Sequence, residues 1–175
     1  NIQLGDSLDD FLYALEYLDN GNYLLCGHTF NYNALGISDV WLLEMQPNGT
    51  VLWQKTFGTV NFDRIENSKG MIIKDNHIYI VGRSSLGSTA GYFVKTDMQG
   101  NLINEKKYER SITVDKFIGI QEWDDESLII IGQKYPNESS NEYYPSGWIL
   151  KVDTSGTFLL VSNLLFGSLY SKVNQ

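Results

Sequence analysis

The sequence contains a single cysteine and no long hydrophobic run. Cys26 has no second cysteine with which to pair, so an internal disulfide framework is excluded, and the pattern fits a buried strand residue. The longest apolar stretches, at residues 128–131 and 157–161, are far shorter than the roughly 20 residues that a helix needs to cross a bilayer. The sequence therefore predicts no membrane-spanning segment, and the cysteine count leaves the cellular compartment open.

Basic residues are also scarce, because the chain has 13 lysines and arginines against 21 acidic residues, a net charge of −8, and no run of basic residues. Protein surfaces that hold phosphate backbones need such runs, so we expect no nucleic-acid partner. Two scattered histidines and one cysteine are too few for a zinc site of the usual kind. No catalytic constellation or cofactor motif is visible, and we predict no metal, no cofactor and no catalytic residue in this sequence.

What the sequence does contain is one pattern that occurs three times. A run of apolar residues ends in a glycine at Gly27, Gly82 and Gly132. An alternating stretch begins at an aromatic residue and reaches a glycine eight residues later, at residues 41–49, 92–100 and 148–156. Each copy begins at an aspartate, Asp10, Asp63 or Asp115, and the spacings between these aspartates are 53 and 52. Three independent markers therefore agree on one period.

Each copy predicts four strands: one after the aspartate, one ending at the shared glycine, one led by the aromatic residue and one after the turn glycine. A four-stranded repeat of about 50 residues is typical of a propeller blade. We therefore predict an all-β fold, a β-propeller of four-stranded antiparallel blades, with three blades at about residues 10–58, 63–109 and 115–167. Residues 1–5 are interpreted as the tail of a preceding blade and residues 168–175 as the start of a following one.

The number of copies raises the question of ring closure. Propellers close with about four to eight blades, and three blades would leave two exposed sheet edges. The leading interpretation is a segment of a larger propeller, completed by neighbouring blades or domains of the same protein. The alternative is a short chain that closes its ring by self-association. Closure by one chain alone is disfavoured, because the third copy already holds its own fourth strand at residues 157–166.

The first copy carries the most specific motif. The stretch Asp39-Val40-Trp41-Leu42-Leu43 leads to Gly49-Thr50-Val51-Leu52-Trp53, and Phe57-Gly58 follows. This stretch resembles the blades of a family of secreted bacterial propellers, common in the Bacteroidetes, which carry an Asp-x-Trp-Leu strand and an Asp-x-x-Gly turn. The resemblance implies an extracellular or cell-surface location and no shared chemistry. The copies depart from it: Asn104 and Leu160 stand where Trp53 would recur, and Gln46 of the first copy replaces the turn aspartate that is kept at Asp97 and Asp153.

Long loops between the second and third strands lie on one face of the predicted blades, at residues 28–39, 83–91 and 133–147. They combine aromatic rings, which stack, with amide groups, which make directional hydrogen bonds, and this combination suits glycan or protein surfaces. The predicted ligand-binding residues are Phe30, Tyr32, Arg83, Tyr135, Tyr143 and Tyr144. The alternative is that these aromatic side chains only hold the loops against the blades.

One row of polar residues follows the shared glycines directly, at His28, Arg83 and Gln133. Such a row either lines a central site or consists of ordinary solvated strand ends. The aspartates that recur once in each copy are interpreted as structural anchors, because a residue that every repeat needs is normally needed by the fold.

These observations predict a non-catalytic secreted or cell-surface module that binds a glycan or a protein through its long loops, or that spaces other domains. The alternative is part of a glycan-active propeller enzyme whose catalytic acids come largely from other blades. A hydrolase needs two carboxylates that face one cleft. The loop acids on the predicted face are Asp39, Glu138 and Glu142, and the sequence favours no pair among them.

Overall fold

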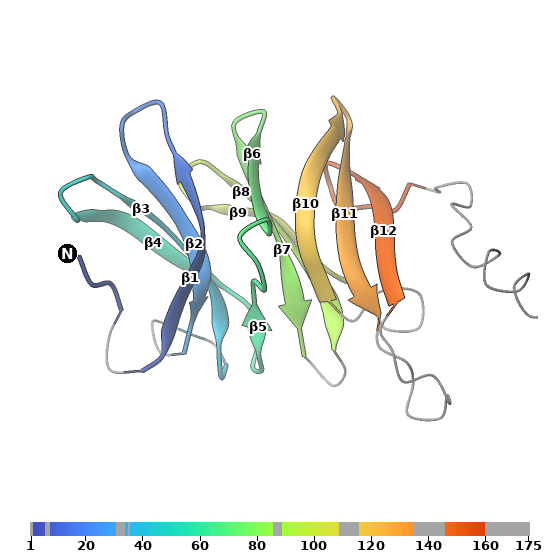
Figure 1. The fold of residues 1–175 in the computed structure, drawn as a ribbon, viewed down its shortest axis with the longest axis horizontal. Helices are drawn as coiled ribbons and strands as arrows, with labels where there is room; N and C mark the ends of the chain where they lie inside the picture. The colour runs from blue at the N-terminus through green and yellow to red at the C-terminus, as the bar shows by residue number, and fades with distance from the viewer. Residues whose placement is uncertain are drawn as a thin grey trace, which may run out of the picture.

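The structure of the protein is a computed structural model that describes residues 2–5, 8–30, 34, 36–85, 89–108, 116–134 and 146–159. Within these ranges the chain forms twelve β-strands and no helix, which confirms the predicted all-β class. All strand pairings within the sheets are antiparallel, and the strands form three sheets that follow one another along the chain (Figure 1). No helix in the described part of the chain is long and apolar enough to cross a membrane.

The first sheet has the four strands that its repeat predicts, in the order β1-β2-β3-β4. The strand bounds are β1 Asp10–Tyr17, β2 Tyr23–Thr29, β3 Asp39–Met45 and β4 Val51–Phe57. Short turns join β1 to β2 and β3 to β4, whereas β2 and β3 are joined by the longer segment 30–38. Each strand therefore pairs with its neighbour in sequence.

The second sheet differs because its predicted first strand is divided. β5 (Asp63–Arg64) and β6 (Met71–Lys74) both pair with β7 (His77–Ser84), and β8 (Ala90–Asp97) and β9 (Leu102–Tyr108) follow. Residues 65–70 leave the ladder between β5 and β6. The shortened pairing places Glu66 beside the sheet rather than within it.

The third sheet contains β10 (Lys116–Asp124), β11 (Ser127–Lys134) and β12 (Ser146–Asp153). Of the predicted fourth strand, residues 157–159 are described, and Phe158 forms an isolated antiparallel bridge with Val152. Residues 160–167 and the predicted blade limits at 109 and 115 lie outside the described residues, as do residues 168–175.

The shared glycine does not end the second strand of each copy, so this part of the prediction is wrong. β2, β7 and β11 all continue for two residues beyond Gly27, Gly82 and Gly132. The first strand of the sheet lies very close at this point. A Cβ atom at Gly27 would overlap the carbonyl oxygen of Phe11, and one at Gly82 would overlap that of Arg64. In these two copies glycine stands here because the backbone of the neighbouring strand occupies the side-chain position.

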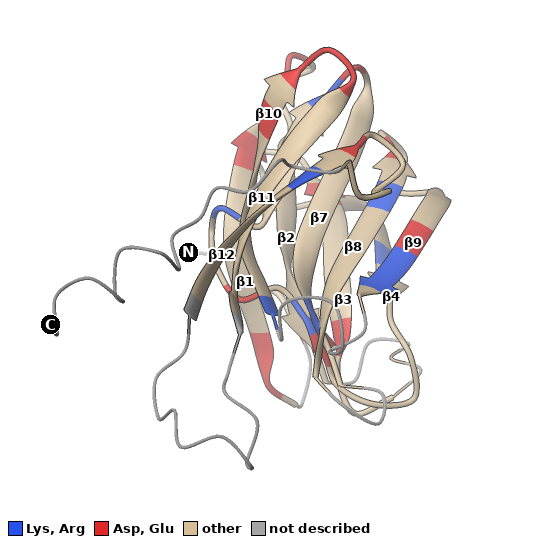
Figure 2. Cartoon of the chain, turned by 90° about the vertical axis from the view of Figure 1, so that its right-hand side faces the viewer, with Lys and Arg blue, Asp and Glu red and all other residues tan. Residues whose placement is uncertain are grey.

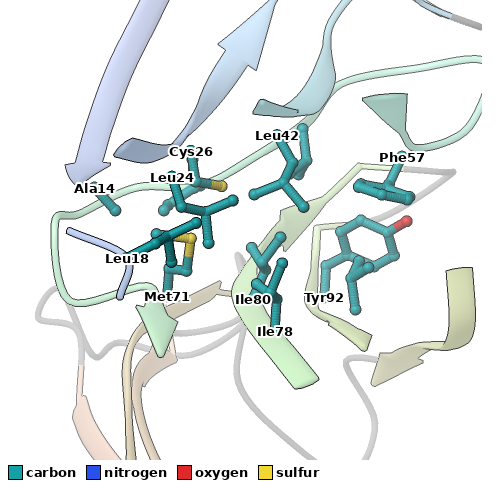
Figure 3. Close-up of a cluster of buried hydrophobic side chains, with 13 residues drawn as sticks. Ala14, Leu18, Leu24, Cys26, Leu42, Phe57, Met71, Ile78, Ile80 and Tyr92 are labelled. Carbon is teal, nitrogen blue, oxygen red and sulfur yellow. The ribbon is translucent and has the colours of Figure 1, made fainter. Parts of the chain in front are cut away.

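The core lies between successive sheets, and β7 contributes to both layers by strand alternation. Ile78 and Ile80 of β7 belong to one buried cluster with Leu24 and Leu42 of the first sheet (Figure 3). Tyr79 and Val81, on the opposite face of β7, belong to a second cluster with residues of the third sheet, Leu128, Ile130, Leu150 and Val152. Each sheet is thus packed face to face on the next. Cys26 lies in the first cluster as a free, buried thiol, and burial raises its pKa.

The two ends of the sheets differ in their connections. At one end, called here the turn end, lie the tight turns at residues 18–22, 46–50, 75–76, 98–101, 125–126 and 154–156. Its hairpins β1–β2, β6–β7 and β10–β11 point upward in Figure 1. At the other, the loop end, lie the starts of β1, β5 and β10, the ends of β2 and β7, and residues 36–38 and 58–62.

The turn residues adopt the backbone conformations that the sequence predicts. Gly49, Gly100 and Gly156 have φ of 95°, 73° and 73°, and Asp75 and Asn76 have φ of 48° and 59°. The aspartates of these turns stabilise them directly. Asp97 accepts hydrogen bonds from the backbone N–H groups of Gln99 and Asn101, and Asp153 accepts them from Ser155 and Thr157.

Candidate functional site

The loop end carries three equivalent cross-strand pairs, one in each sheet. In each, the residue after the repeat aspartate lies opposite the residue after the shared glycine. The pairs are Phe11 with His28, Arg64 with Arg83, and Lys116 with Gln133. Side chains that are directly opposite in an antiparallel ladder project from the same face of the sheet. The polar row that the sequence identifies is therefore one half of a double row.

Three cations of this double row surround one carboxylate. The Nε atom of Arg83 lies 2.6 Å from Oε1 of Glu66, and the Nε atom of Arg64 lies 3.5 Å from the same oxygen. The Nζ atom of Lys116 lies 3.7 Å from Oε2. We call these four residues the basic cluster: Arg64, Arg83, Lys116 and the acid Glu66. Their side chains are 18–28% exposed, so solvent reaches them.

The basic cluster arises from the divided first strand of the second sheet. Like charges directly opposite one another on neighbouring strands repel, and Arg64 and Arg83 are such a pair. Glu66 approaches both guanidinium groups because residues 65–70 leave the ladder after β5. Arg64 is held from a second side, since its Cζ atom lies 5.5 Å from the centre of the Phe62 ring.

Four aromatic rings form a second group beside the basic cluster. The ring of His28 lies 4.9 Å from that of Phe11, 5.6 Å from that of Tyr13 and 5.7 Å from that of Phe30. We call these residues the aromatic cluster. Phe11 and Tyr13 are 42% and 39% exposed, although aromatic side chains of this size are usually well covered.

Phe62 joins the two clusters. Its ring lies 6.4 Å from that of Phe30 in an edge-on arrangement, and Arg64 lies over it. Beside Phe30 there is a shallow hollow of about 440 Å³. It is lined by Leu8, Asp9, Phe30, Gly36 and Ile37. The loop end thus presents apolar rings, cations and a concave surface in one continuous region.

His28 is buried at 3% exposure, so its interpretation as a solvated strand end is wrong. Burial lowers the pKa of its imidazole to about 4, and the neighbouring Arg64 guanidinium acts in the same direction. A hydrogen bond to the backbone of Ile65 and the charge of Asp10 oppose this shift. His28 is therefore neutral at pH 7 and links the first sheet to the segment after β5.

Buried polar atoms without a hydrogen bond concentrate at this end. Within the described part of the chain, they include Nδ1 of His28, Oγ of Ser38 and Ser84, Oδ1 of Asp63, Nε of Arg64 and Arg83, and Oε1 of Glu66. The last three take part in ion pairs. Such atoms are uncommon in native proteins, and they are often partnered by water, an ion or a ligand. Their gathering at one end makes the loop end the candidate functional site of the described residues.

The structure describes two of the six predicted ligand-binding residues. Phe30 belongs to the aromatic cluster and Arg83 to the basic cluster, and Phe62 and Arg64 connect them. Tyr32, Tyr135, Tyr143 and Tyr144 lie outside the described residues, as do Glu138 and Glu142 of the alternative enzyme. Asp39 is fully buried.

Sequence reasoning missed Phe11, Arg64, Lys116 and Glu66. The first three stand directly after the repeat aspartates Asp10, Asp63 and Asp115, so the repeat itself carried a signal for them. Glu66 had none, because Tyr13 and Ile118 stand at the equivalent places of the other copies. Among the residues that the structure describes, no group of three or more histidine, cysteine, aspartate or glutamate side chains is arranged to hold a metal ion.

The recurring aspartate of the second copy is a structural anchor, as predicted. Asp63 is fully buried, and its Oδ2 atom accepts hydrogen bonds from the backbone N–H and the hydroxyl group of Thr59, at 2.6 and 2.7 Å. It therefore fixes the connection between the first and second sheets. Asp115 lies outside the described residues.

Comparisons with known proteins give no family for this chain. No family model matches it, and no curated protein matches it. Among solved structures, it is similar to a chain from the complex of Drosophila Plexin A with Semaphorin 1b, with a TM-score of 0.53 and 11% sequence identity. The match covers 85% of this chain and 29% of that chain. At this identity the likeness concerns the fold alone, and the present chain spans less than a third of the chain that it resembles.

Proposed function

We propose that this chain is a non-catalytic binding module, built from three consecutive β-propeller blades, whose loop end binds a glycan or a protein. The observation that carries the proposal is the contact between the basic and aromatic clusters through Phe62, in a region where buried polar atoms lack hydrogen bonds. Rigid sheets hold both clusters in place. Binding residues commonly lie on such connections at the ends of a rigid scaffold.

The arrangement of the sheets supports the propeller. Successive sheets pack face to face, and residues at equivalent places of β4 and β9 contact the next sheet. Trp53 of β4 lies against Gly100, and Asn104 of β9 donates a hydrogen bond to the carbonyl oxygen of Ser155. Such stepwise docking is what radially repeated blades require. Further blades of a longer protein, or a second copy of this chain, would complete the ring.

The same proposal includes a secreted or cell-surface location. It rests on the resemblance of the first copy to secreted bacterial propellers of the Bacteroidetes type, seen at Asp39, Trp41 and Gly49. The alternative enzyme receives less support, because the fully buried Asp39 faces no cleft.

The exposed rings favour a glycan over a protein as the ligand. Phe11 and Tyr13 stack at an interplanar angle of 18°, so they offer nearly parallel faces. Flat aromatic faces bury the apolar face of a sugar ring, while polar groups beside them bind its hydroxyls. Arg83 and the amide of Gln133 lie on the same end and supply such polar groups.

The test measures binding of the full chain to a glycan array and then the affinity of the best ligand. Phe11→Ala and Phe30→Ala should each weaken binding by about tenfold, which corresponds to about 1.4 kcal/mol. Tyr17→Ala is the matched control, because Tyr17 is an exposed aromatic residue on β1 that lies toward the turn end. Binding that survives both loop-end changes and is lost in the control contradicts the proposal. A triple alanine variant at Tyr135, Tyr143 and Tyr144 tests the remaining predicted residues.

A further inference from the structure

Each sheet places one apolar cross-strand pair on the face that looks toward the following sheet. The residue before the shared glycine lies opposite the residue after the leading aromatic residue, and the three pairs are Cys26 with Leu42, Val81 with Phe93, and Ile131 with Ile149. The first two pairs are fully buried in the clusters between successive sheets. Ile131 and Ile149 are 44% and 48% exposed on the third sheet, which stands toward the reader in Figure 2. The third sheet therefore presents an uncovered copy of the face that the other two sheets bury.

The opposite face of each sheet receives the preceding sheet, and its equivalent residues behave in the same way. On neighbouring strands, Leu15 lies opposite Leu25, Met71 opposite Ile80, and Ile120 opposite Ile130. Met71 and Ile120 are buried in the clusters that join their sheets to the preceding ones. Leu15 is 58% exposed. The first sheet therefore presents an uncovered receiving face.

Residues 2–5 already contribute to this receiving face. Leu4 stands directly before Gly5, as Phe57 stands directly before Gly58. Phe57, at the end of β4, packs in the cluster between the first and second sheets, and Leu4 packs in a similar way on the cluster of Leu25, Trp41, Leu43 and Met45. Residues 2–5 thus lie where the last strand of a preceding sheet would end, and they leave Leu15 uncovered.

A second copy of this chain fits both faces. One chain carries the two halves of the interface that joins its own sheets, because its third sheet has a face to be covered and its first sheet has a face that receives. Contacts between different surfaces of identical chains run head to tail, and they close into a ring when the rotation allows it. Two copies of three sheets give six, which lies within the four to eight blades that close a propeller.

We propose that two copies of this chain join head to tail, with the third sheet of each docked on the first sheet of the other, in one closed ring of six sheets. Ile131 and Ile149 of one copy then cover Leu15 of the other. The inference rests on the propeller in the proposed function, since it names the partner that completes the ring. The rotation between the copies runs about the ring axis, so both loop ends lie on the same side of the ring. A glycan with repeated units then meets two binding regions.

Sedimentation velocity of the chain measures its mass in solution. We expect twice the chain mass of 19.9 kDa, with no larger species as the concentration rises. Ile131→Glu and Leu15→Glu each place a charge in both interfaces of the ring, and each should raise the dissociation constant of the dimer by at least about 100-fold. Ile149→Glu repeats the first change in case Ile131→Glu does not fold, and circular dichroism checks the folding of each variant. Ile103→Glu is the matched control, because Ile103 is exposed on β9 of the second sheet, whose two faces are already packed.

A mixture of the Ile131→Glu and Leu15→Glu variants tests the head-to-tail direction. Each variant alone has both interfaces damaged. In a mixed dimer both substitutions fall in one interface, and the other interface keeps its two native faces. The mixture should therefore form a 1:1 complex at concentrations at which either variant alone is monomeric.

Several results would overturn the inference. A chain that remains monomeric at about 100 μM would do so, and the two faces would then belong to contacts with other blades of a longer protein. A dimer that Ile131→Glu disrupts and Leu15→Glu leaves intact would mean that the third sheets pair with each other. Masses that rise without limit would indicate an open filament in place of the ring. If monomeric protein binds a glycan and Phe11→Ala weakens that binding, this inference fails and the proposed function stands, whereas a six-sheet dimer that binds no glycan or protein gives the reverse.

Discussion

The turn end and the loop end differ in how fully their buried polar groups are hydrogen-bonded. At the turn end, the carboxylate of Glu44 accepts hydrogen bonds from Asn20 at 2.9 Å, from Asn22 at 2.6 Å and from the indole N–H of Trp53 at 2.7 Å. Burial alone would raise the pKa of Glu44, but these three hydrogen bonds outweigh it and keep the pKa below its ordinary value. Both oxygens of this carboxylate therefore accept hydrogen bonds from the protein itself.

The loop end has a comparable set of polar groups without such saturation. Two arginines share one carboxylate, and buried atoms of His28, Ser38 and Ser84 have no hydrogen-bond partner among the described residues. Unsatisfied groups of this kind lower stability. The comparison therefore teaches that the Glu44 carboxylate is hydrogen-bonded within the protein at the turn end, whereas several buried polar atoms at the loop end have no hydrogen-bond partner among the described residues.

The largest expected effect comes from a change that forces apart the strands of the loop end. In Gly82→Ala, the new methyl group would overlap the carbonyl oxygen of Arg64 on β5. Because this neighbour is backbone, it cannot rotate away, and we expect the free energy of unfolding to fall by about 3 kcal/mol. Urea denaturation followed by tryptophan fluorescence measures the change.

Gly147→Ala is the matched control for this prediction. Gly147 is exposed on β12, and a Cβ atom there would meet nothing within 4 Å. The expected change in the free energy of unfolding is within about 0.5 kcal/mol. A Gly82→Ala variant as stable as this control would show that β5 is not held against β7 in the way described.

The sequence predicted the repeating part of this organisation well. The three markers located the strands, because hydrophobic alternation and turn residues act locally. The row at His28, Arg83 and Gln133 was also found by position. The burial of His28 was not predicted, since its imidazole meets the backbone of Ile65 in the segment after β5, to which it is hydrogen-bonded. Sequence patterns within one copy contain no information about that contact.

Glu66 shows most clearly what repetition cannot reveal. It lies in the segment 65–70, where the second copy departs from the regular strand of the others, so no equivalent residue points to it. The basic cluster is likewise absent from the linear sequence, because Arg64, Arg83 and Lys116 are widely separated in the chain and meet only through the sheet pairing. Charge counts along a sequence therefore miss a local cationic group in an acidic protein.

The next effect concerns the saturated carboxylate of the turn end. Glu44→Ala removes the acceptor and leaves the donors of Asn20, Asn22 and Trp53 without it. We expect the free energy of unfolding to fall by about 2 to 3 kcal/mol, because partly buried donors lose their hydrogen bonds. Affinity for a loop-end ligand should stay unchanged. A loss of ligand binding equal to that of the Phe11→Ala variant would contradict the separation of the two ends.

The third prediction uses pH to separate the same two ends. The pKa of His28 is about 4 in the folded protein and lies near its ordinary value of 6.5 when the chain unfolds. Between these values only the unfolded chain binds the proton, so the His28 contribution to stability is present above pH 6.5 and is lost as the pH falls toward 4. The free energy of unfolding should decrease by about 2 kcal/mol between pH 7 and pH 5 from this group alone.

Variants of the two histidines test this assignment. His28→Gln should lose this part of the pH dependence, as measured by urea denaturation at both pH values. His77→Gln should retain it, because His77 lies at the turn end and His28 is still present. If the His28→Gln variant loses stability between pH 7 and pH 5 as steeply as the unmodified protein, the groups responsible lie elsewhere.

The smallest expected effect compares one acid from each end. Glu66→Gln leaves Arg64 and Arg83 opposite one another without their shared counter-charge, and it should lower the free energy of unfolding by about 1 kcal/mol at low salt. Added salt screens this repulsion, so the loss should shrink as the ionic strength rises. Glu126→Gln, at an exposed position of the turn end, should show no comparable dependence on salt. A loss in Glu66→Gln that is independent of salt would mean that Glu66 acts by packing, and the electrostatic contrast between the two ends would then not hold.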